Sequence, residues 1–288
     1  MPELPEVAAL VADLGRRLTG RTIDRLDVFS VAALKTFDPA PSALAGRVVT
    51  GAVRHGKYLD IEVGADLHLV IHLARGGWIT WRNAAPPISA RPPTKSPVAG
   101  RLVLDDGSGI DISEYGTKKD LAIHLVRDPE SIARIATLGP DPLDPGFALA
   151  DFATILAAAG RAQIKGVLRS QSVIAGIGNA YSDEILHVAK MSPYAPATMA
   201  PDAVARLFAA MQSTLRGAIA RSEGVAAADL KKEKKLGMRV HGRTGQPCPV
   251  CGDTVREVIF ADSKLQYCPT CQTKGKPLAD RVLSRLLK

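Results

Sequence analysis

Four cysteines near the C-terminal end are the residues whose type and spacing most clearly define a chemistry. They follow the pattern C-x2-C-x16-C-x2-C, and the chain has no other cysteine. Thiolates in two such pairs are typical of a tetrahedral zinc site. Disulfide pairing is the alternative, and the lack of a recognisable secretory signal argues against it. The predicted ligands of one structural zinc ion are Cys248, Cys251, Cys268 and Cys271.

A second candidate is the start of the sequence, which reads MPELPE. Methionine before a small residue is normally removed, and this would leave Pro2 as a terminal secondary amine beside the carboxyl group of Glu3. Terminal amines titrate near about pH 8, so a useful fraction is unprotonated and nucleophilic at neutral pH. Such an amine attacks electrophilic carbons such as C1′ of a sugar. Any chain can begin Met-Pro, so this interpretation depends on the rest of the sequence.

A glycine-containing turn at residues 171–181 is the third candidate, with the sequence QSVIAGIGNAY. Its glycines allow the backbone to approach a ligand closely, and Asn179 stands where a helix is expected to begin. Helix N-termini bind phosphate groups. The alternative is that Asn179 only caps an ordinary helix.

The composition favours a polyanionic partner. The 288-residue chain has a net charge of +8, and only 5% of its residues are aromatic. No apolar stretch is long enough to span a bilayer, and a membrane-surface helix would need aromatic anchors. Nucleic acid is therefore the expected partner, with no membrane association. A cytoplasmic location follows from the lack of a targeting segment.

Apolar periodicity predicts the elements that position these residues. Apolar residues at helical spacing predict a helix over residues 3–18. Short alternating segments then predict an antiparallel β-sandwich with strands at 22–29, 47–54, 57–63, 67–73, 78–82, 101–104, 110–113 and 121–125. Residues 83–97 are expected to form a long loop. After a proline- and glycine-containing boundary at 138–143, helices are expected at 147–158, 163–170, 179–189 and 202–222, then a hairpin from 255–260 and 264–267.

Taken together, these motifs resemble the formamidopyrimidine-DNA glycosylase and endonuclease VIII family of base-excision repair enzymes. The shared segments occur in family order at 2–7, 55–59, 138–143, 164–165, 171–181 and 241–243, followed by the cysteine pairs. The resemblance implies an α+β multidomain fold. The domains it implies are an N-terminal helix with a β-sandwich (1–137), a helix-two-turn-helix domain (138–240), a zinc hairpin (241–272) and a basic tail (273–288).

The family resemblance also implies roles for single residues. Pro2 would attack C1′ of a flipped-out damaged nucleotide while Glu3 transfers protons at the sugar, and Glu6 and Lys57 would complete the catalytic set. The partner would be double-stranded DNA with damaged or abasic nucleotides, bound by a monomer. Taken alone, Lys57 would be interpreted as a solvated lysine at a strand end and Lys165 as an exposed helix lysine, and only their positions in the family motifs favour phosphate binding. The expected DNA-binding residues are Lys57, Arg75, Lys165, Asn179, Tyr181 and Lys264.

The sequence departs from the family pattern where the extruded base leaves a gap. Arg75 replaces a methionine, and residues 115–120 lack the usual arginine and phenylalanine. At the hairpin tip, this chain has Ser263 at the position where the family usually has an arginine. The neighbouring Lys264 could substitute as a point charge, but it lacks the guanidinium fork of arginine. The lysine-rich segment 231–235 replaces the loop that caps oxidised guanine.

These observations predict a bifunctional DNA glycosylase and abasic-site lyase with weak activity on 8-oxoguanine. One alternative is a protein that binds damaged or abasic DNA without cutting it, which the altered gap-filling residues would favour. The other is a plain zinc-ribbon nucleic-acid binder with an unrelated N-terminal domain. An active terminal amine would distinguish the first hypothesis from both alternatives.

Overall fold

The computed structural model describes residues 1–86, 96–259 and 264–279. The chain divides into two compact units. The first comprises Met1–Thr137 and Ser222–Leu230, and the second comprises Leu138–Arg221 and Lys231–Lys288. Most of the expected 83–97 loop, the hairpin tip with Asp262 and Ser263, and the basic tail from residue 280 lie outside the described residues.

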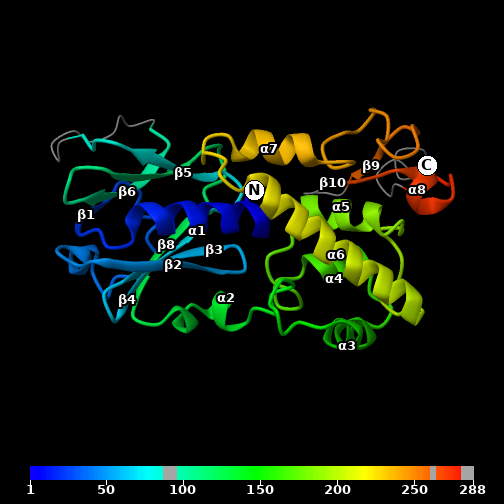
Figure 1. The fold of residues 1–288 in the computed structure, drawn as a ribbon, viewed down its shortest axis with the longest axis horizontal. Coiled ribbons are helices and arrows are strands. Elements are labelled where there is room, and N and C mark those ends of the chain that lie inside the picture. The colour runs from blue at the N-terminus through cyan, green and yellow to red at the C-terminus, as the bar shows by residue number, and fades with distance from the viewer. Residues whose placement is uncertain (87–95, 260–263, 280–288) are drawn as a thin grey trace. The chain divides into compact units, whose positions relative to one another are not determined.

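Helix α1 (Leu4–Leu18) opens the first unit, as the apolar periodicity predicted. A proline in its first turn and basic residues in its last turn suit a helix start and a helix end. Its buried face packs against strands β2 and β3, which Figure 1 shows beside it. The apolar side chains of that face join the main core, and they are Val7, Leu10, Leu14 and Leu18.

Two four-stranded antiparallel sheets form the body of this unit. One has the order β1-β6-β7-β5 and comprises β1 (Ile23–Val28), β6 (Val98–Leu104), β7 (Gly109–Glu114) and β5 (Gly77–Arg82). The other has the order β2-β3-β4-β8 and comprises β2 (Val49–His55), β3 (Tyr58–Val63), β4 (Leu67–His72) and β8 (Ala122–Val126). All eight predicted strands are present, so the predicted antiparallel sandwich is confirmed. Three short helical segments were not predicted, η1 (Pro41–Leu44), η2 (Pro129–Ser131) and α2 (Ala133–Ala136).

Strand register explains how the core of the sandwich is filled. Leu59 pairs with Ile71 and Ile61 pairs with Leu69 across β3 and β4, and all four side chains are fully buried. Branched and apolar cross-strand pairs of this kind stabilise a sheet face. Ile112 of the other sheet belongs to the same core cluster.

The second unit is mainly helical, with α3 (Leu149–Ala159), α4 (Ile164–Arg169), α5 (Asn179–Val188), α6 (Pro201–Ser222) and α7 (Leu230–Gly237). The first four were predicted. The first residues of this unit lie against the turn before α5. Gly139 is required at this contact, because a Cβ on residue 139 would lie 2.4 Å from the carbonyl carbon of Val173. Among the described residues, no helix is both long and apolar enough to cross a bilayer.

Helix α7 holds the lysine-rich segment 231–235, for which the sequence predicted no regular structure. Lysine, glutamate and leucine are strong helix formers. The residues before α7 contribute to the first unit, because the indole nitrogen of Trp78 donates to the carbonyl oxygen of Ala227 at 3.0 Å. Leu230 is part of the sandwich core.

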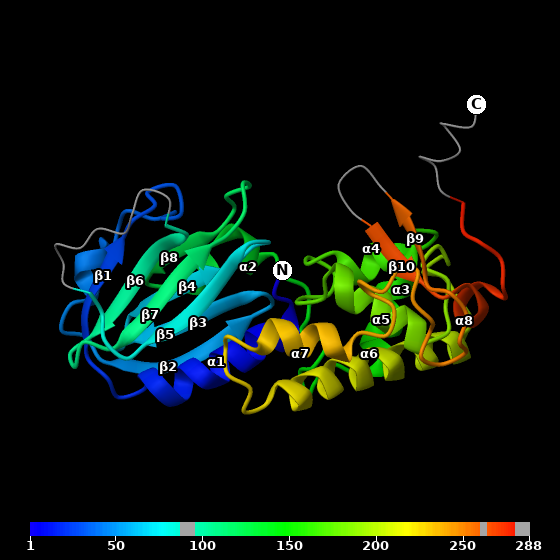
Figure 2. The ribbon, with the colours of Figure 1, turned by 90° about the horizontal axis from the view of Figure 1, so that it is seen from above.

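The cysteine-containing hairpin consists of β9 (Arg256–Ile259) and β10 (Lys264–Tyr267), followed by α8 (Pro269–Thr273). Figure 2 shows the two strands near α5, which contacts β10. A small apolar cluster lies under the hairpin and includes Val258, Leu265 and Tyr267. Because this cluster is so small, the hairpin needs another source of stability.

Candidate functional site

The start of α1 holds two buried carboxylates next to Pro2. Glu3 and Glu6 are each 2% exposed, and the backbone nitrogen of Glu3 donates to Glu6 Oε2 at 2.9 Å. Glu3 is the residue that caps the helix, so both carboxylates lie where the helix dipole stabilises negative charge. Pro2 is also buried, whereas Met1 is exposed. Loss of Met1 would therefore create a secondary amine that is already fixed beside two acids.

Lys57 lies in the two-residue turn between β2 and β3. Gly56 has a φ of +55°, which fits a hairpin turn that needs glycine at its first central position. Lys57 itself is largely buried. The ring of the next residue, Tyr58, packs on the ring of His72 with centroids 4.6 Å apart.

His72 is neutral at ordinary pH. Burial, followed by the charges of Lys57 and Arg134, lowers the pKa of His72 to about 4. Burial also lowers the pKa of His124. Neither histidine therefore adds positive charge at neutral pH, and this role falls to lysine and arginine side chains.

A pocket of about 680 Å³ lies beside the N-terminus in the first unit. Its lining includes one acidic residue, Asp120. The pocket therefore suits an anionic ligand, and Met1, His72 and His124 also line it. Its basic lining residues are Lys35, Arg75, Lys118, Lys119 and Arg134.

Two loops that depart from the family pattern meet at this pocket. Gly77 pairs with Glu114 in the β5–β7 register, which brings the turn before β5 to the end of β7. The backbone nitrogen of Tyr115 donates to the carbonyl oxygen of Gly76 at 3.0 Å, and a Cβ on Gly76 would lie 2.0 Å from the carbonyl oxygen of Tyr115. Arg75, exposed in this turn, follows Ala74, whose φ of +47° is strained for a residue other than glycine.

Glu114 orders the second of these loops. Its Oε1 accepts hydrogen bonds from the backbone nitrogens of Asp120 and Leu121, both at 2.7 Å. The Lys119 ammonium donates to the Glu114 carbonyl oxygen at 2.7 Å. Arg75 and the 115–120 segment depart from the family pattern at separate places in the sequence, and both contribute lining residues to this one pocket. Within the segment, Lys118, Lys119 and Asp120 line it.

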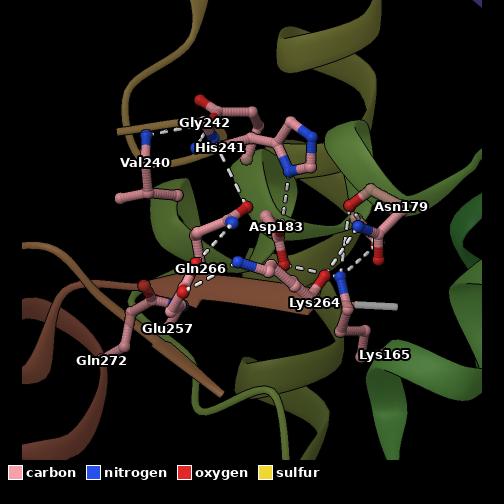
Figure 3. Close-up of polar contacts among 12 residues, drawn as sticks. Lys165, Asn179, Asp183, Val240, His241, Gly242, Glu257, Lys264, Gln266 and Gln272 are labelled. Carbon is pink, nitrogen blue, oxygen red and sulfur yellow. Dashed lines mark hydrogen bonds and ion pairs between the residues drawn. The ribbon is translucent and has the colours of Figure 1, made fainter. Parts of the chain in front are cut away.

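A buried polar network in the second unit centres on Asp183 (Figure 3). Lys165 Nζ donates to Asp183 Oδ1 at 2.5 Å, to Ser182 Oγ at 2.8 Å and to the carbonyl oxygen of Asn179 at 3.2 Å. The other oxygen of Asp183 lies 2.8 Å from Nδ1 of His241. The network links α4, α5 and the segment that leads into the hairpin. The sequence predicted roles for Lys165 and Asn179, and it placed His241 in a family segment without a role.

Asn179 links α5 to the hairpin, as Figure 3 shows. Its Nδ2 donates to the carbonyl oxygen of Lys264 at 2.7 Å. Its Oδ1 is buried without a hydrogen-bond partner among the described residues. Gly178 is the helix cap, so the alternative that Asn179 merely caps α5 is wrong. The turn before it is held by Gln171, whose Nε2 donates to the Ile177 carbonyl oxygen at 2.7 Å.

Glu184 fixes the approach to the hairpin, a role that the sequence did not indicate. Its carboxylate accepts hydrogen bonds from the backbone nitrogens of Arg239, Val240 and His241 at 2.8–2.9 Å. Burial raises the pKa of Glu184, and these three bonds oppose the shift. The adjacent acids Asp183 and Glu184, four and five residues after Asn179, were the available sequence signal.

Two other predicted DNA-binding residues have internal contacts. Lys264 Nζ lies 3.0 Å from Glu257 Oε1, with the lysine side chain about half exposed. Tyr181 is 2% exposed, and the Lys234 ammonium lies 4.8 Å from its ring centroid. The described contacts of Tyr181 support a packing role, and its contact with DNA stays a prediction.

The four cysteines form one cluster. Cys248 Sγ lies 3.9 Å from Cys271 Sγ, and Cys251 Sγ lies 3.3 Å from Cys268 Sγ. These separations are far longer than a disulfide bond of about 2.05 Å. The Cys248–Cys271 separation matches the sulfur–sulfur edge of about 3.8 Å that zinc–sulfur bonds of about 2.3 Å give in a tetrahedron, whereas the Cys251–Cys268 separation is shorter than that edge. The cluster is therefore suited to a metal ion rather than to disulfides.

Protons compete with a metal ion at this cluster. Burial raises the pKa of Cys268 to about 11, and burial also raises the pKa of Cys271. A metal must displace these thiol protons when it binds. One further donor, His187, lies close to three of the cysteines. It was not predicted, because a single histidine in a helix carries no spacing signal.

Comparison with known proteins relates these features to one family. Residues 1–113 match the N-terminal domain of formamidopyrimidine-DNA glycosylase, residues 138–229 match its H2TH domain, and residues 245–274 match the zinc finger found in FPG and IleRS. A formamidopyrimidine-DNA glycosylase-like protein of Mycobacterium tuberculosis is 61% identical over 152 residues, which is 52% of this chain and 94% of that protein.

Relatives and solved structures that match over most of the chain belong to the same family. The formamidopyrimidine-DNA glycosylase of Moorella thermoacetica is 35% identical over 90% of this chain and 94% of its own length. The Lactococcus lactis Fpg structure in complex with DNA containing an abasic site has a TM-score of 0.81 at 25% identity, and the match covers 94% of this chain and 99% of that chain. The chain therefore belongs to the formamidopyrimidine-DNA glycosylase family of DNA-repair enzymes, which act on damaged DNA.

Proposed function

We propose that this protein removes damaged bases from DNA and cleaves the strand at the resulting abasic site, using Pro2 as the nucleophile. The observation that carries the proposal is the position of Pro2. It is buried at the start of α1 between Met1, which borders a basic pocket, and Glu3. A secondary amine held beside a carboxylate and a basic pocket suits attack on the sugar of an anionic polymer.

Each step uses groups that the first unit supplies. The Pro2 nitrogen, once free of Met1, bonds to C1′ as the bond to the base breaks and the base leaves with a proton. The Pro2 nitrogen then gives up its proton, O4′ is protonated, the sugar ring opens at the C1′–O4′ bond, and an iminium results. The iminium acidifies the C2′ proton, and removal of this proton expels the 3′ phosphate by elimination. Glu3 is the group nearest in sequence that can donate or accept these protons. Glu6 receives the Glu3 backbone N–H and so orients the residue that carries the acid.

The second unit would hold the DNA strand. The N-terminus of α5 offers backbone N–H groups to a phosphate, and Asn179 joins it to Lys264 of the hairpin. Lys165 would act mainly by fixing this end of α5, because its ammonium is committed to the Asn179 carbonyl oxygen and to Asp183. In the first unit, Lys57 would contact a DNA phosphate, and Arg75 would lie where the extruded base leaves a gap in the duplex.

The cysteine cluster would hold zinc, with Cys248, Cys251, Cys268 and Cys271 as thiolate ligands. Zinc is favoured because it accepts four sulfur ligands in a tetrahedron without a redox change. The ion would supply most of the stability of a hairpin whose apolar cluster is small.

We expect 8-oxoguanine to be a poor substrate of this protein. Arg75 and the 115–120 loop line a charged pocket where the family pattern would provide an apolar wedge. Lesions that need little unstacking should therefore be the better substrates. The same feature favours one other candidate function, binding of abasic DNA without strand cleavage.

Borohydride trapping on DNA with one abasic site tests the proposal. Mass spectrometry first establishes whether Met1 has been removed. The processed protein should form a covalent adduct, whereas protein with one extra residue before Pro2, which keeps that nitrogen as an amide, should bind the same DNA without an adduct. Binding without an adduct by both forms would refute the lyase and support the non-cleaving alternative.

A further inference from the structure

The metal centre has a fifth candidate donor outside the four cysteines. His187 lies in the last turn of α5 and is 2% exposed. Its Nε2 is 3.3 Å from Cys248 Sγ. One of its ring nitrogens and the sulfurs of Cys248, Cys268 and Cys271 all lie within 4.8 Å of one another. A neutral imidazole nitrogen is a common zinc ligand, so this group is a complete Cys3His set.

Bond lengths show that the imidazole is close enough to bind the ion. With zinc–sulfur bonds of about 2.3 Å and zinc–nitrogen bonds of about 2.0–2.1 Å, a tetrahedral site has a nitrogen–sulfur edge of about 3.5 Å. The separation of 3.3 Å between His187 and Cys248 is near this value. It also fits an N–H···S hydrogen bond, so distance alone does not distinguish an outer contact from a ligand.

Exposure differs among the four thiols. Cys251 is exposed, whereas Cys248 and Cys268 are buried and Cys271 is intermediate. The exposed thiol is also the one outside the group that includes His187. The centre therefore offers five candidate donors to an ion that would take four ligands. Cys251 is the sulfur that solvent and reagents reach most easily.

The surroundings of His187 leave its tautomer unfixed. Its Nδ1 is buried and has no hydrogen-bond partner among the described residues. Histidine ligands are usually locked in one tautomer by a carboxylate or carbonyl at the other nitrogen. Without such a lock, Nε2 can be the protonated donor to Cys248 in one state and the bare ligand in another.

We propose that His187 is a reserve ligand of this metal centre. When the Cys251 thiolate is absent, the His187 imidazole takes its place and a Cys3His site retains the ion. The inference rests on the metal centre of the proposed function, but not on the glycosylase or lyase chemistry.

Metal binding by full-length variants tests this proposal with Co²⁺ as the probe. Cys251→Ala should bind one Co²⁺ per chain and keep tetrahedral d–d absorption, and the charge-transfer band should fit three thiolates. In the Zn²⁺ form, the ¹⁵N resonance of one His187 ring nitrogen should shift to a metal-bound position in Cys251→Ala and not in the parent. His187→Phe alone should still bind one ion through four cysteines.

The double variant Cys251→Ala with His187→Phe gives the sharpest comparison. Its Co²⁺ affinity should be lower than that of Cys251→Ala by more than about 100-fold, since loss of a mere outer-shell partner costs 10–100-fold. Cys251→Ala with His68→Phe, a histidine of the other unit, should match Cys251→Ala.

Two results would overturn the reserve-ligand role. One is a Cys251→Ala protein that loses the ion or keeps it without a His187 shift. The other is a double variant that binds as tightly as Cys251→Ala. A parent protein that binds no metal at all would instead refute the metal centre itself.

Discussion

Lys165 and Asp183 form a buried ion pair in the second unit, with Nζ and Oδ1 2.5 Å apart and side chains 7% and 0% exposed. A lysine at this position of the sequence was expected to reach a DNA phosphate. In the structure the Lys165 ammonium pairs with Asp183 and also donates hydrogen bonds to Ser182 and the Asn179 carbonyl oxygen, and its contact with a DNA phosphate stays a prediction. Its contribution to DNA binding would then pass through the orientation of α5.

The first prediction concerns this pair. Asp183→Asn should lower the free energy of unfolding of the second unit by about 3–5 kcal/mol, because it leaves the Lys165 charge buried without its partner. Asp202→Asn is the control, since Asp202 forms an exposed pair with Arg206 at 3.8 Å and should lose about 0–1 kcal/mol. Urea denaturation measures both. Equal losses would contradict the buried-pair assignment.

The second prediction separates the two steps of the proposed reaction. Glu3→Gln should slow base removal more than cleavage of a preformed abasic site. At a preformed abasic site no base has to leave, so the proton transfer by Glu3 that accompanies its departure is not needed. Single-turnover rates on the two substrates measure the difference. Glu130→Gln, an exposed acid of the same unit, should change neither rate. Equal loss on both substrates in Glu3→Gln would argue against this role.

The third prediction is a pH dependence of stability. The pKa of His72 is about 4 in the folded protein, against about 6.5 when unfolded. Between these values the unfolded chain binds the additional proton, so the free energy of unfolding falls as the pH falls from about 6.5 to 4. The loss is at most about 3 kcal/mol, and less where water reaches the ring.

His72→Gln should remove this part of the acid sensitivity. Tyr58→Phe, which alters the stacked partner without removing a group that titrates in this range, should keep it. Denaturation of the three proteins between pH 7 and 4 compares the slopes. An unchanged slope in His72→Gln would show that other groups cause the acid sensitivity.

Much of the architecture could be predicted because local patterns determine it. Alternation identified all eight strands, and 3.6-residue periodicity identified α1 and four later helices. The cysteine spacing likewise identified the metal cluster. The lysine-rich α7 was missed because a charged segment has the composition of a solvated loop as well as that of a helix. Its first residue, Leu230, packs in the sandwich core, and no local pattern in the sequence indicates that contact.

Contacts between distant residues could not be predicted in the same way. Arg75 and Lys119 come together because β5 pairs with β7, an order that no local pattern encodes. The burial of Lys165 depends on Asp183, one of several acids that could have been exposed. His187 reaches the cysteines because α5 packs against the hairpin.

The fourth prediction concerns removal of the metal. Chelation or Cys268→Ser should unfold the hairpin and weaken DNA binding while the sandwich stays folded, because ion binding of order 10 kcal/mol stabilises isolated fingers. The two tryptophans, Trp78 and Trp81, both lie in β5 and report on the sandwich alone. Their fluorescence should not change, whereas proteolysis near the hairpin should accelerate. Normal DNA affinity without metal would show that the hairpin is dispensable for binding.

Acid should have the same effect as a chelator. Since the raised pKa values of Cys268 and Cys271 favour the protonated thiols, metal affinity should fall as the pH falls. Competition with a chelator at several pH values measures this trend. A pH-independent affinity would mean that the thiols are not the ligands.

The last prediction concerns the substrate range. Extruding a base costs a few kcal/mol of unstacking, and least where the base is absent, mismatched or unpaired. Arg75 and Lys119 cannot form the apolar wedge that would offset this cost, so abasic sites, ring-opened bases and single-stranded lesions should be processed much faster than 8-oxoguanine opposite cytosine. Arg75→Met should narrow that gap by raising the rate on 8-oxoguanine, whereas Arg127→Met, at an exposed site in the same unit, should not. Single-turnover rates on matched duplexes decide the question. If the parent protein excises 8-oxoguanine opposite cytosine as fast as it cleaves an abasic site, the charged pocket does not restrict the lesion range.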